Sequence, residues 1–192
     1  MPRTQRDPIR TSADFKKKGS QRIRERFFFF SFSALLLGLD LSTKELALSY
    51  LGARGIPLLP RLLSLRLICN SGAALGMLSS HTWVVGVIEI IGCLAFGAGL
   101  FFSRSPLLSW GLSLGLAGGA GNLADRIIHA HGFLNGCVVD FIDYGWFIGN
   151  LADIYLFFCA ICICVFLLRS SRLRGTDEKS NTSSRKSGGR KV

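Results

Sequence analysis

Apolar residues gather into four long segments of the chain, and shorter polar stretches separate them. A helix of about 20 mostly apolar residues is long enough to cross the hydrocarbon core of a bilayer. We therefore predict four membrane-spanning helices, near residues 27–51, 83–102, 106–124 and 147–168. The third segment is rich in glycine, which favours close approach of neighbouring helices in a membrane.

The connection over residues 52–82 has a different pattern. Gly55, Pro57 and Pro60 break it, and residues 61–67 then alternate between polar and apolar side chains. Alternation with a period of two predicts one or two short strands. The predicted fold class is therefore an all-α membrane protein with four transmembrane helices and a small extracytoplasmic segment that contains β structure. Residues 126–146 are expected to form a second outer loop.

Basic residues lie mostly in two tails. Of 23 Lys and Arg, nine precede Phe27 and eight lie from Arg169 onward. Cytoplasmic flanks of spanning helices carry an excess of Lys and Arg, so residues 1–26 and 169–192 are both predicted to be cytoplasmic, the second of them disordered. The intervening residues, 27–168, form one domain. A net charge of +11 that is confined to tails does not indicate a nucleic-acid-binding surface.

Six cysteines are present, and most are expected to pack as small hydrophobes. Cys159, Cys162 and Cys164 fall inside an apolar run, without the second pair or nearby histidines that a zinc site requires. Cys69 and Cys137 are the two expected outside the membrane. Their spacing alone does not say whether they approach each other.

Three predicted spans carry an acid at a similar depth. At 1.5 Å per residue, Asp40 lies about 20 Å from the inner interface, Asp125 about 28 Å and Asp153 about 22 Å. Glu89 and the loop residue Asp140 fall near the same level. An acid near the centre of a spanning helix costs about 2.5–3.5 kcal/mol, so several at one depth indicate a shared polar site.

The pentapeptide Gly-Asn-Leu-Ala-Asp occurs twice, ending at Asp125 and at Asp153. Its Asn and Asp are three residues apart, so on a helix they share a face. In each copy, Asn122 with Asp125 and Asn150 with Asp153, the two side chains can bond to each other or to one common ligand.

Several of these residues also have a purely structural interpretation. Asp40 and Lys44 are four residues apart on a helix and can neutralise each other. Asp125 can form an ion pair with Arg126 at the end of a helix. Glu89 can be a single hydrogen-bonded acid within the bundle, and its role stays open.

The loop acid and the histidines give weaker signals. Asp143 is expected to be a solvated turn residue, because it stands close to Gly145. His129 and His131 form an H-x-H pair in the loop, a pattern that more often lies at the surface than on a metal. No metal site is therefore predicted.

At these residues the chain resembles the lipoprotein signal peptidases, which are bacterial membrane-embedded aspartic proteases. The matching motifs occur in the family's order: Asp40-x-x-x-Lys44, Asn70-Ser-Gly72-Ala-Ala-Leu-Gly76, Gly118-Gly-Ala-Gly-Asn122-Leu-Ala-Asp125-Arg126, Val138-Val-Asp140-Phe141 and Asn150-Leu-Ala-Asp153. The resemblance covers about residues 39–168. Leu75 and Gly149 stand where the family often has Phe.

The resemblance implies a role for each matched residue. Asp140 and Asp153 correspond to the catalytic aspartates, and Asp40 with Lys44 to a supporting pair. The residues implied to shape the site or hold substrate are Asn70, Gly72, Asn122, Asp125, Arg126 and Asn150. Two carboxylates that share a proton can hydrolyse a peptide bond without a metal or cofactor.

The resemblance also implies a substrate and a place. The substrate is a prolipoprotein whose cysteine carries a diacylglyceryl group, cut just before that cysteine. The enzyme is implied to be a monomer in the bacterial inner membrane, among membrane lipids, with its site on the extracytoplasmic side. The lipoproteins that it cuts cannot be named from the sequence.

Two other functions would account for part of the sequence pattern. A small transporter is suggested by the duplicated pentapeptide at two span ends, since carriers are often built from internal repeats. Its repeat is only five residues long, however, and no span is broken at its midplane. The other is a structural membrane protein whose basic tails are attracted to anionic lipid. This function leaves the acids at one depth unexplained.

Overall fold

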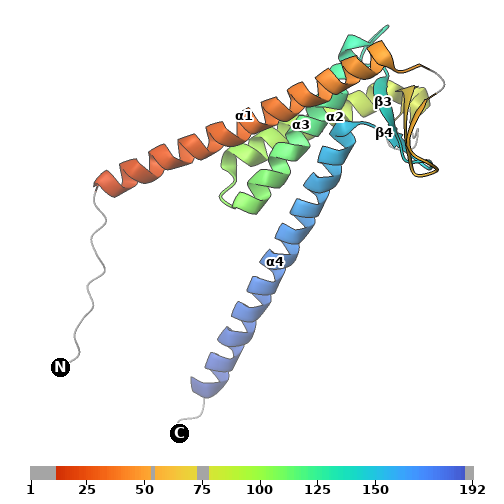
Figure 1. Ribbon diagram of the computed structural model, residues 1–192. Helices are drawn as coiled ribbons and strands as arrows, with labels where there is room; N and C mark the ends of the chain where they lie inside the picture. Colours follow the sequence, from red (N-terminus) through yellow and green to blue (C-terminus); the bar gives the residue numbers. More distant parts are fainter. Residues whose placement is uncertain (1–11, 53–54, 73–77, 189–192) are drawn as a thin grey trace.

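The computed structural model describes residues 12–52, 55–72 and 78–188, and it is mostly helical (Figure 1). Four helices longer than 20 residues and a small sheet make up its framework. In chain order the elements are α1 (Ser12–Tyr50), β1 (Ile56–Leu59), β2 (Leu63–Asn70), the short 3-10 helix η2 (Ser79–His81), α2 (Thr82–Phe102), α3 (Pro106–Ile128), β3 (Val138–Asp143), β4 (Ile148–Gly149) and α4 (Leu151–Gly188).

Helix α3 is the centre of the bundle and packs against α1, α2 and α4. A Cβ atom on Gly118 would lie 2.6 Å from the carbonyl oxygen of Ala152 on α4, and one on Gly121 would collide with the Asp40 carboxylate on α1. The buried Ser33 hydroxyl of α1 also donates to the carbonyl oxygen of Ser113, at 3.0 Å. The close helix approach predicted from the glycines is therefore confirmed, and it brings polar groups of three helices together.

The four strands form one antiparallel sheet, in the order β1-β2-β3-β4, at one end of the bundle. The predicted strands near residues 61–67 are confirmed, but as β1 and β2 with the turn at Arg61, whose φ is 65°. Residues 126–146, which were predicted as an outer loop, contain the last turn of α3 and the strand β3. In β3, Asp140 pairs with Ile68 and Val138 pairs with Asn70 of β2.

Within the residues that the structure describes, three helices are long and apolar enough to cross a membrane: Gly19–Tyr50, Ser79–Phe102 and Leu151–Arg172. The chain thus has the character of a membrane protein. The third predicted span corresponds to α3, whose glycines, serines and polar C-terminal turn make it less apolar than the other three.

Two helix bounds differ from the predicted ones. The fourth span was predicted from residue 147, but α4 begins at Leu151, because residues 148–149 form β4. Helix also continues into both basic segments, from Ser12 in α1 and as far as Gly188 in α4, where disorder was predicted from residue 169. Lys, Arg, Gln and Glu are good helix formers, and extending an existing helix avoids the cost of nucleation.

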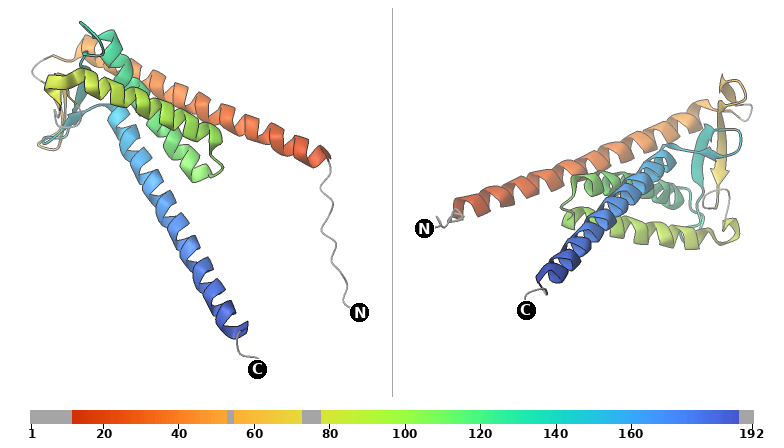
Figure 2. Two further views of the ribbon diagram at one scale, coloured as in Figure 1. Left: turned by 180° about the vertical axis from the view of Figure 1, so that it is seen from behind. Right: turned by 90° about the horizontal axis from the view of Figure 1, so that it is seen from below.

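Both long helices extend away from the sheet. The N-terminal part of α1 and the C-terminal part of α4 lie at the same end of the bundle, opposite the sheet (Figure 2). The connection between α2 and α3 lies at that end as well. The bundle therefore has one end capped by the sheet and one end formed by basic helix segments.

Candidate active site

Lys44 of α1 lies among three oxygen atoms from two helices. Its Nζ atom is 2.8 Å from Asp40 Oδ2, 2.9 Å from Asp125 Oδ2 and 3.1 Å from Asn122 Oδ1. The predicted contact between Asp40 and Lys44 is present, and both side chains are fully buried. Asp40 Oδ1 also accepts a hydrogen bond from the backbone N–H of Ala152, at 2.8 Å. One cation thus ties α1 to α3, and its acid partner ties α1 to α4.

Asp125 bonds differently from its predicted ion pair with Arg126. Besides Lys44, its Oδ2 atom accepts from the backbone N–H of Val139, at 3.0 Å. The prediction of a helix-end pair between neighbours is wrong, since adjacent residues on a helix point to different faces. Asp125 instead fixes β3 to the end of α3, and it therefore positions the strand that carries Asp140.

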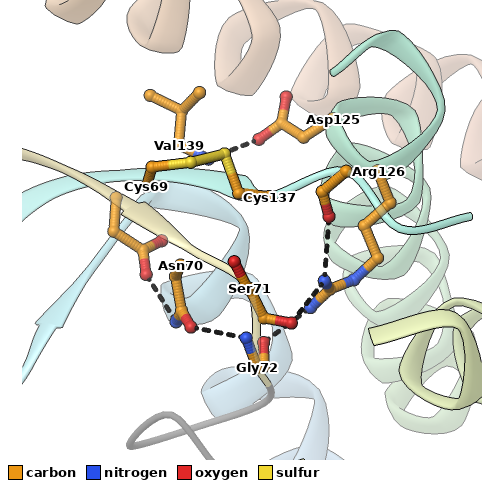
Figure 3. Close-up of a disulfide and its surroundings, with 10 residues drawn as sticks. Cys69, Asn70, Ser71, Gly72, Asp125, Arg126, Cys137 and Val139 are labelled. Atoms are coloured by element: carbon orange, nitrogen blue, oxygen red, sulfur yellow. Dashed lines mark hydrogen bonds between the residues drawn. A yellow bond between two sulfur atoms is a disulfide. The ribbon is translucent and has the colours of Figure 1, made fainter. Parts of the chain in front are cut away.

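Arg126 pairs with Glu89 of α2. Its Nε atom is 3.0 Å from each Glu89 carboxylate oxygen, and its remaining nitrogens donate to the carbonyl oxygens of Gly72, Ser71 and Gly136 at 2.6, 3.4 and 3.3 Å (Figure 3). Only 1% of Arg126 is exposed. Glu89 therefore is not a lone acid but the counter-ion of an arginine that holds two outer segments in place.

The second pentapeptide forms a capping box at the start of α4. Asn150 Oδ1 accepts from the backbone N–H of Asp153, at 3.1 Å, and Asp153 Oδ2 accepts from the backbone N–H of Asn150, at 3.0 Å. Each side chain of this copy thus bonds to the backbone of the other residue, and not to its side chain as predicted, because Asn150 precedes the helix as its cap. Reciprocal bonds of this kind satisfy two backbone donors that a helix N-terminus leaves free.

Asp140 of β3 is buried and accepts two amide hydrogen bonds. Asn70 Nδ2 donates to its Oδ2 atom at 2.8 Å, and Asn150 Nδ2 donates to its Oδ1 atom at 2.7 Å. Burial raises the pKa of Asp140 from 3.8 to about 6, and the negative charge of Asp153 adds to the rise, against the two amide bonds. Asp140 is therefore a carboxyl group that holds a proton more readily than an exposed aspartate does.

Two asparagines connect Asp140 to Asp153. Asn150 Nδ2, which binds Asp140, also donates to Asn122 Oδ1 at 3.1 Å, and Asn122 Nδ2 donates to Asp153 Oδ1 at 3.3 Å. Asp140 is buried, whereas Asp153 is partly exposed. The structure thus brings together both predicted catalytic aspartates, one deep and one reaching the surface, in a single hydrogen-bond network.

A disulfide lies directly beside this network. Cys69 of β2 is bonded to Cys137, with their Cα atoms 5.3 Å apart, and each adjoins a paired residue, Asn70 and Val138 (Figure 3). The Asn70 side chain also accepts from the backbone N–H of Gly72, at 3.0 Å. The bond thus fastens the segment that carries Asn70 and Gly72 to the strand of Asp140. The rest of this sequence motif, residues 73–76, lies outside the described residues.

Tyr144 lies near the site and was not identified from the sequence. Burial raises the pKa of the Tyr144 phenol, and the charge of Asp153 raises it further. Asp143 is not simply solvated: it accepts from the backbone N–H of Gly145 at 2.8 Å and pairs with Arg66 at 3.4 Å. The predicted turn at Asp143 and Gly145 is present, but the sequence did not predict the pairing of Asp143 with Arg66 on the neighbouring strand.

The H-x-H pair, His129 and His131, lies at and just beyond the C-terminus of α3. His129 ends α3, and its Nδ1 atom is buried without a hydrogen-bond partner. Over residues 12–52, 55–72 and 78–188, no group of three or more His, Cys, Asp and Glu side chains could hold a metal ion.

Comparison with known proteins gives a consistent result. The family model of signal peptidase II matches residues 32–169. A lipoprotein signal peptidase of Bifidobacterium longum subsp. infantis is 41% identical over 149 residues, covering 77% of this chain and 82% of that protein. One of Rhodococcus jostii is 36% identical over 158 residues, covering 80% and 78%.

A solved structure is similar as well. It is a bacterial membrane enzyme determined by the in meso method at 2.3 Å resolution, and it matches with a TM-score of 0.67 and 28% identity, covering 75% of this chain and 89% of that one. The family match over residues 32–169 includes every residue of the network described above. The chain therefore belongs to the signal peptidase II family of membrane proteases.

Proposed function

We propose that the protein is a lipoprotein signal peptidase that removes signal peptides from prolipoproteins, cutting just before the diacylglyceryl-modified cysteine. The names of its relatives support this function. The structural observation that supports this function most strongly is the hydrogen-bond network that joins Asp140, Asn150, Asn122 and Asp153. The transporter alternative has no support from the comparisons.

The protease is of the aspartic type in this proposal, with Asp140 and Asp153 as the catalytic pair. Asp140, which is fully buried, is assigned the proton, and Asp153, which reaches the surface, is the better candidate to contact water. Asp153 in its ionised form takes a proton from a water molecule, which attacks the peptide carbonyl carbon. Asp140 donates its proton toward the carbonyl oxygen, and the tetrahedral intermediate then collapses with protonation of the leaving amine.

The surrounding residues position this pair. Asn70 and Asn150 hold both oxygens of Asp140, while Asn122 aims one oxygen of Asp153. Asp125 fixes β3 through the backbone of Val139. Further out, Arg126 holds Gly72, and Lys44 with Asp40 joins the helices behind the site. Positioning of this kind lowers the barrier because the reacting groups need not reorganise.

The protein has four membrane spans in this proposal, with α3 as the third. An even number places both termini on one side, and the basic segments at both ends assign that side to the cytoplasm. The sheet and the aspartate pair then lie toward the extracytoplasmic face of the bacterial inner membrane. A lipid-anchored cysteine lies at that level, so the scissile bond and the carboxylates share a depth. The protein is expected to act as a monomer.

Cleavage of a lipid-modified precursor by the purified full chain tests the function. Asp140→Asn is expected to lower the cleavage rate about 10²–10⁴-fold, the usual size of a general acid–base contribution. Asp143→Asn is the matched control, because Asp143 lies on the same strand but pairs with Arg66, and it should keep most of the rate. Full activity of Asp140→Asn would reject the pair. An inactive wild type that transports a solute into vesicles would favour the transporter.

A further inference from the structure

A cavity of about 730 Å³ lies at the end of the bundle opposite the sheet. It is formed by the N-terminal half of α1 and the connection between α2 and α3, and we call it the arginine pocket. The residues that line it are Gln21, Arg22, Arg24, Glu25, Arg26, Phe28, Phe29, Leu100, Phe102, Ser103, Arg104, Ser105, Pro106 and Ser109. Its volume falls within the range of about 300–1,000 Å³ that is usual for ligand sites.

The pocket is strongly positive. Four arginines and one glutamate line it. Glu25 accepts a hydrogen bond from Gln21 at 3.0 Å, and the Arg26 guanidinium lies 4.3 Å from the centre of the Phe101 ring. In the described part of the chain, no ion pair involves Arg22, Arg24 or Arg104. These three guanidinium groups therefore have their donors available for an anion.

The N-terminus of α3 adds to the positive potential. Ser105 is the N-cap of this 23-residue helix, with Pro106 in its first turn, and both line the pocket beside Arg104. The aligned peptide dipoles of a helix place a partial positive charge at this end, which stabilises a nearby phosphate.

Apolar side chains line the same cavity. Phe28 and Phe29 belong to the apolar run of α1, and Phe102 is the last residue of α2. Trp110 of α3 contacts the rings of Phe28 and Phe29, with centroids 5.9 and 5.2 Å away. Cationic and apolar groups thus meet at the level where the spanning helices α1 and α2 change from apolar to polar sequence. A soluble phosphate would contact only the cationic groups of the pocket, whereas a phospholipid would contact both the cationic and the apolar groups.

We propose that the arginine pocket binds an anionic phospholipid, with its phosphate on Arg22, Arg24 and Arg104 and its acyl chains along the phenylalanines. Guanidinium groups bind phosphate oxygens through paired donors, and basic pockets between spanning helices suit anionic headgroups. A basic peptide segment is disfavoured by the same arginines. The bound lipid joins α1 to the connection between α2 and α3, far from the aspartate pair, so the site is independent of the catalytic proposal.

Fluorescence quenching of Trp110 tests the site. The full chain carrying Trp83→Phe and Trp146→Phe retains Trp110 as its single tryptophan. It is reconstituted in vesicles that mix phosphatidylcholine with phosphatidylglycerol, one of the two brominated in its acyl chains. The wild-type pocket should quench preferentially with brominated phosphatidylglycerol. Arg22→Gln or Arg104→Gln should each lower that preference about fivefold, the contribution of one basic residue.

Two control variants separate the pocket from general attraction to an anionic surface. Arg104→Lys keeps the charge and should keep most of the preference. Arg169→Gln removes the same charge from an exposed position of α4 outside the pocket and should leave the preference unchanged. Circular dichroism confirms that each variant keeps its helix content.

Three results would overturn the proposal. Equal quenching by the two lipids would show no anion site, and an equal loss in Arg169→Gln would show only a surface effect. Displacement of brominated phosphatidylglycerol by glycerol phosphate at the same concentration would show a site for the free anion rather than for a lipid.

Discussion

The two copies of Gly-Asn-Leu-Ala-Asp are identical in sequence but lie at opposite kinds of helix end. The first ends at Asp125, one turn before the C-terminus of α3, and the second ends at Asp153, in the first turn of α4. Inside a helix the backbone donors are already bonded, whereas the first N–H groups of a helix are free. The position along the helix therefore decides which partners the same side chains find.

In the α3 copy, the side chains bond outward. Asn122 accepts from Lys44 and donates to Asp153, while Asp125 pairs with Lys44 and accepts from Val139. Both connect α3 to α1 through Lys44, and in addition Asn122 connects α3 to α4 while Asp125 connects it to β3. In this copy Asn and Asp share one common partner, the Lys44 ammonium, instead of bonding to each other.

In the α4 copy, the side chains are partly used by their own helix. One side-chain oxygen of Asn150 and one of Asp153 cap α4 by accepting from backbone N–H groups. This leaves the other Asp153 oxygen for Asn122 and the Asn150 amide nitrogen for Asp140. Capping fixes the orientation of both side chains. The α3 copy therefore joins elements of the bundle, while the α4 copy orients a carboxylate.

The largest effect is expected when the α3 copy loses its common partner. Lys44→Met leaves Asp40 and Asp125 buried without their cation, and removing one partner of a buried pair costs about 3–5 kcal/mol of unfolding free energy. Denaturant titration in detergent measures it. Arg66→Met is the matched control, because the Arg66 side chain is 50% exposed beside Asp143, and it should cost about 0–1 kcal/mol. Equal costs would contradict the role of the α3 copy.

The next effect concerns the connection between the two copies. Cys69→Ser with Cys137→Ser removes the bond that holds this connection to β2, and it should lower the unfolding free energy by about 2–4 kcal/mol. Thermal unfolding with and without a reductant measures the loss. Reductant should lower the unfolding temperature of the wild type but not that of the double variant. Cys164→Ser, which alters an exposed free cysteine, should behave as the wild type.

The smallest stability effect is expected at the cap of the α4 copy. Asn150→Ala removes the N-cap of α4 and should cost about 1 kcal/mol, whereas Asn150→Ser keeps a capping oxygen and should cost less. Both variants lose the amide that donates to Asp140, so both should cut the precursor more slowly. A cleavage rate of Asn150→Ser equal to that of the wild type would show that this amide is only structural.

The pH dependence of Asn150→Ser sharpens the same point. The amide of Asn150 favours the ionised form of Asp140, so its loss should move the alkaline limb of the rate profile above the wild-type value near pH 6. The raised pKa of Asp140 also makes the unfolding free energy depend on pH. The contribution of protonated Asp140 is fully present below pH 3.8 and is lost as the pH rises through about 6.

Local pattern predicted the helices well, because each long apolar run has one way to satisfy its backbone in a membrane. Partner choice was harder to predict. Arg126 adjoins Asp125 in sequence, but its true partner, Glu89, comes from another helix, and only the packing of α2 on α3 brings them together. Strand β3 was missed for a similar reason, since its pairing with β2 joins residues about 70 positions apart.

The candidate site was predicted more fully than the sheet that carries it. The motifs named Asp140 and Asp153, and the structure connects them through Asn150 and Asn122. The bond between Cys69 and Cys137 could not be inferred, because spacing along the chain gives no distance between loops. The catalytic role of Asp140 and Asp153 is a proposal that experiment decides.

The most direct test of that role is the cleavage rate of Asp153→Asn, measured beside its unfolding temperature. The value of kcat should fall about 100-fold or more, while the unfolding temperature falls only by the effect of one lost hydrogen bond, about 1 kcal/mol, because the amide can replace one of the two accepting oxygens of Asp153 but not both. Asp125→Asn, in the α3 copy, should lower the unfolding temperature further, since Lys44 loses a buried charged partner. A folded Asp153→Asn variant that cleaves the precursor at the wild-type kcat would contradict the account.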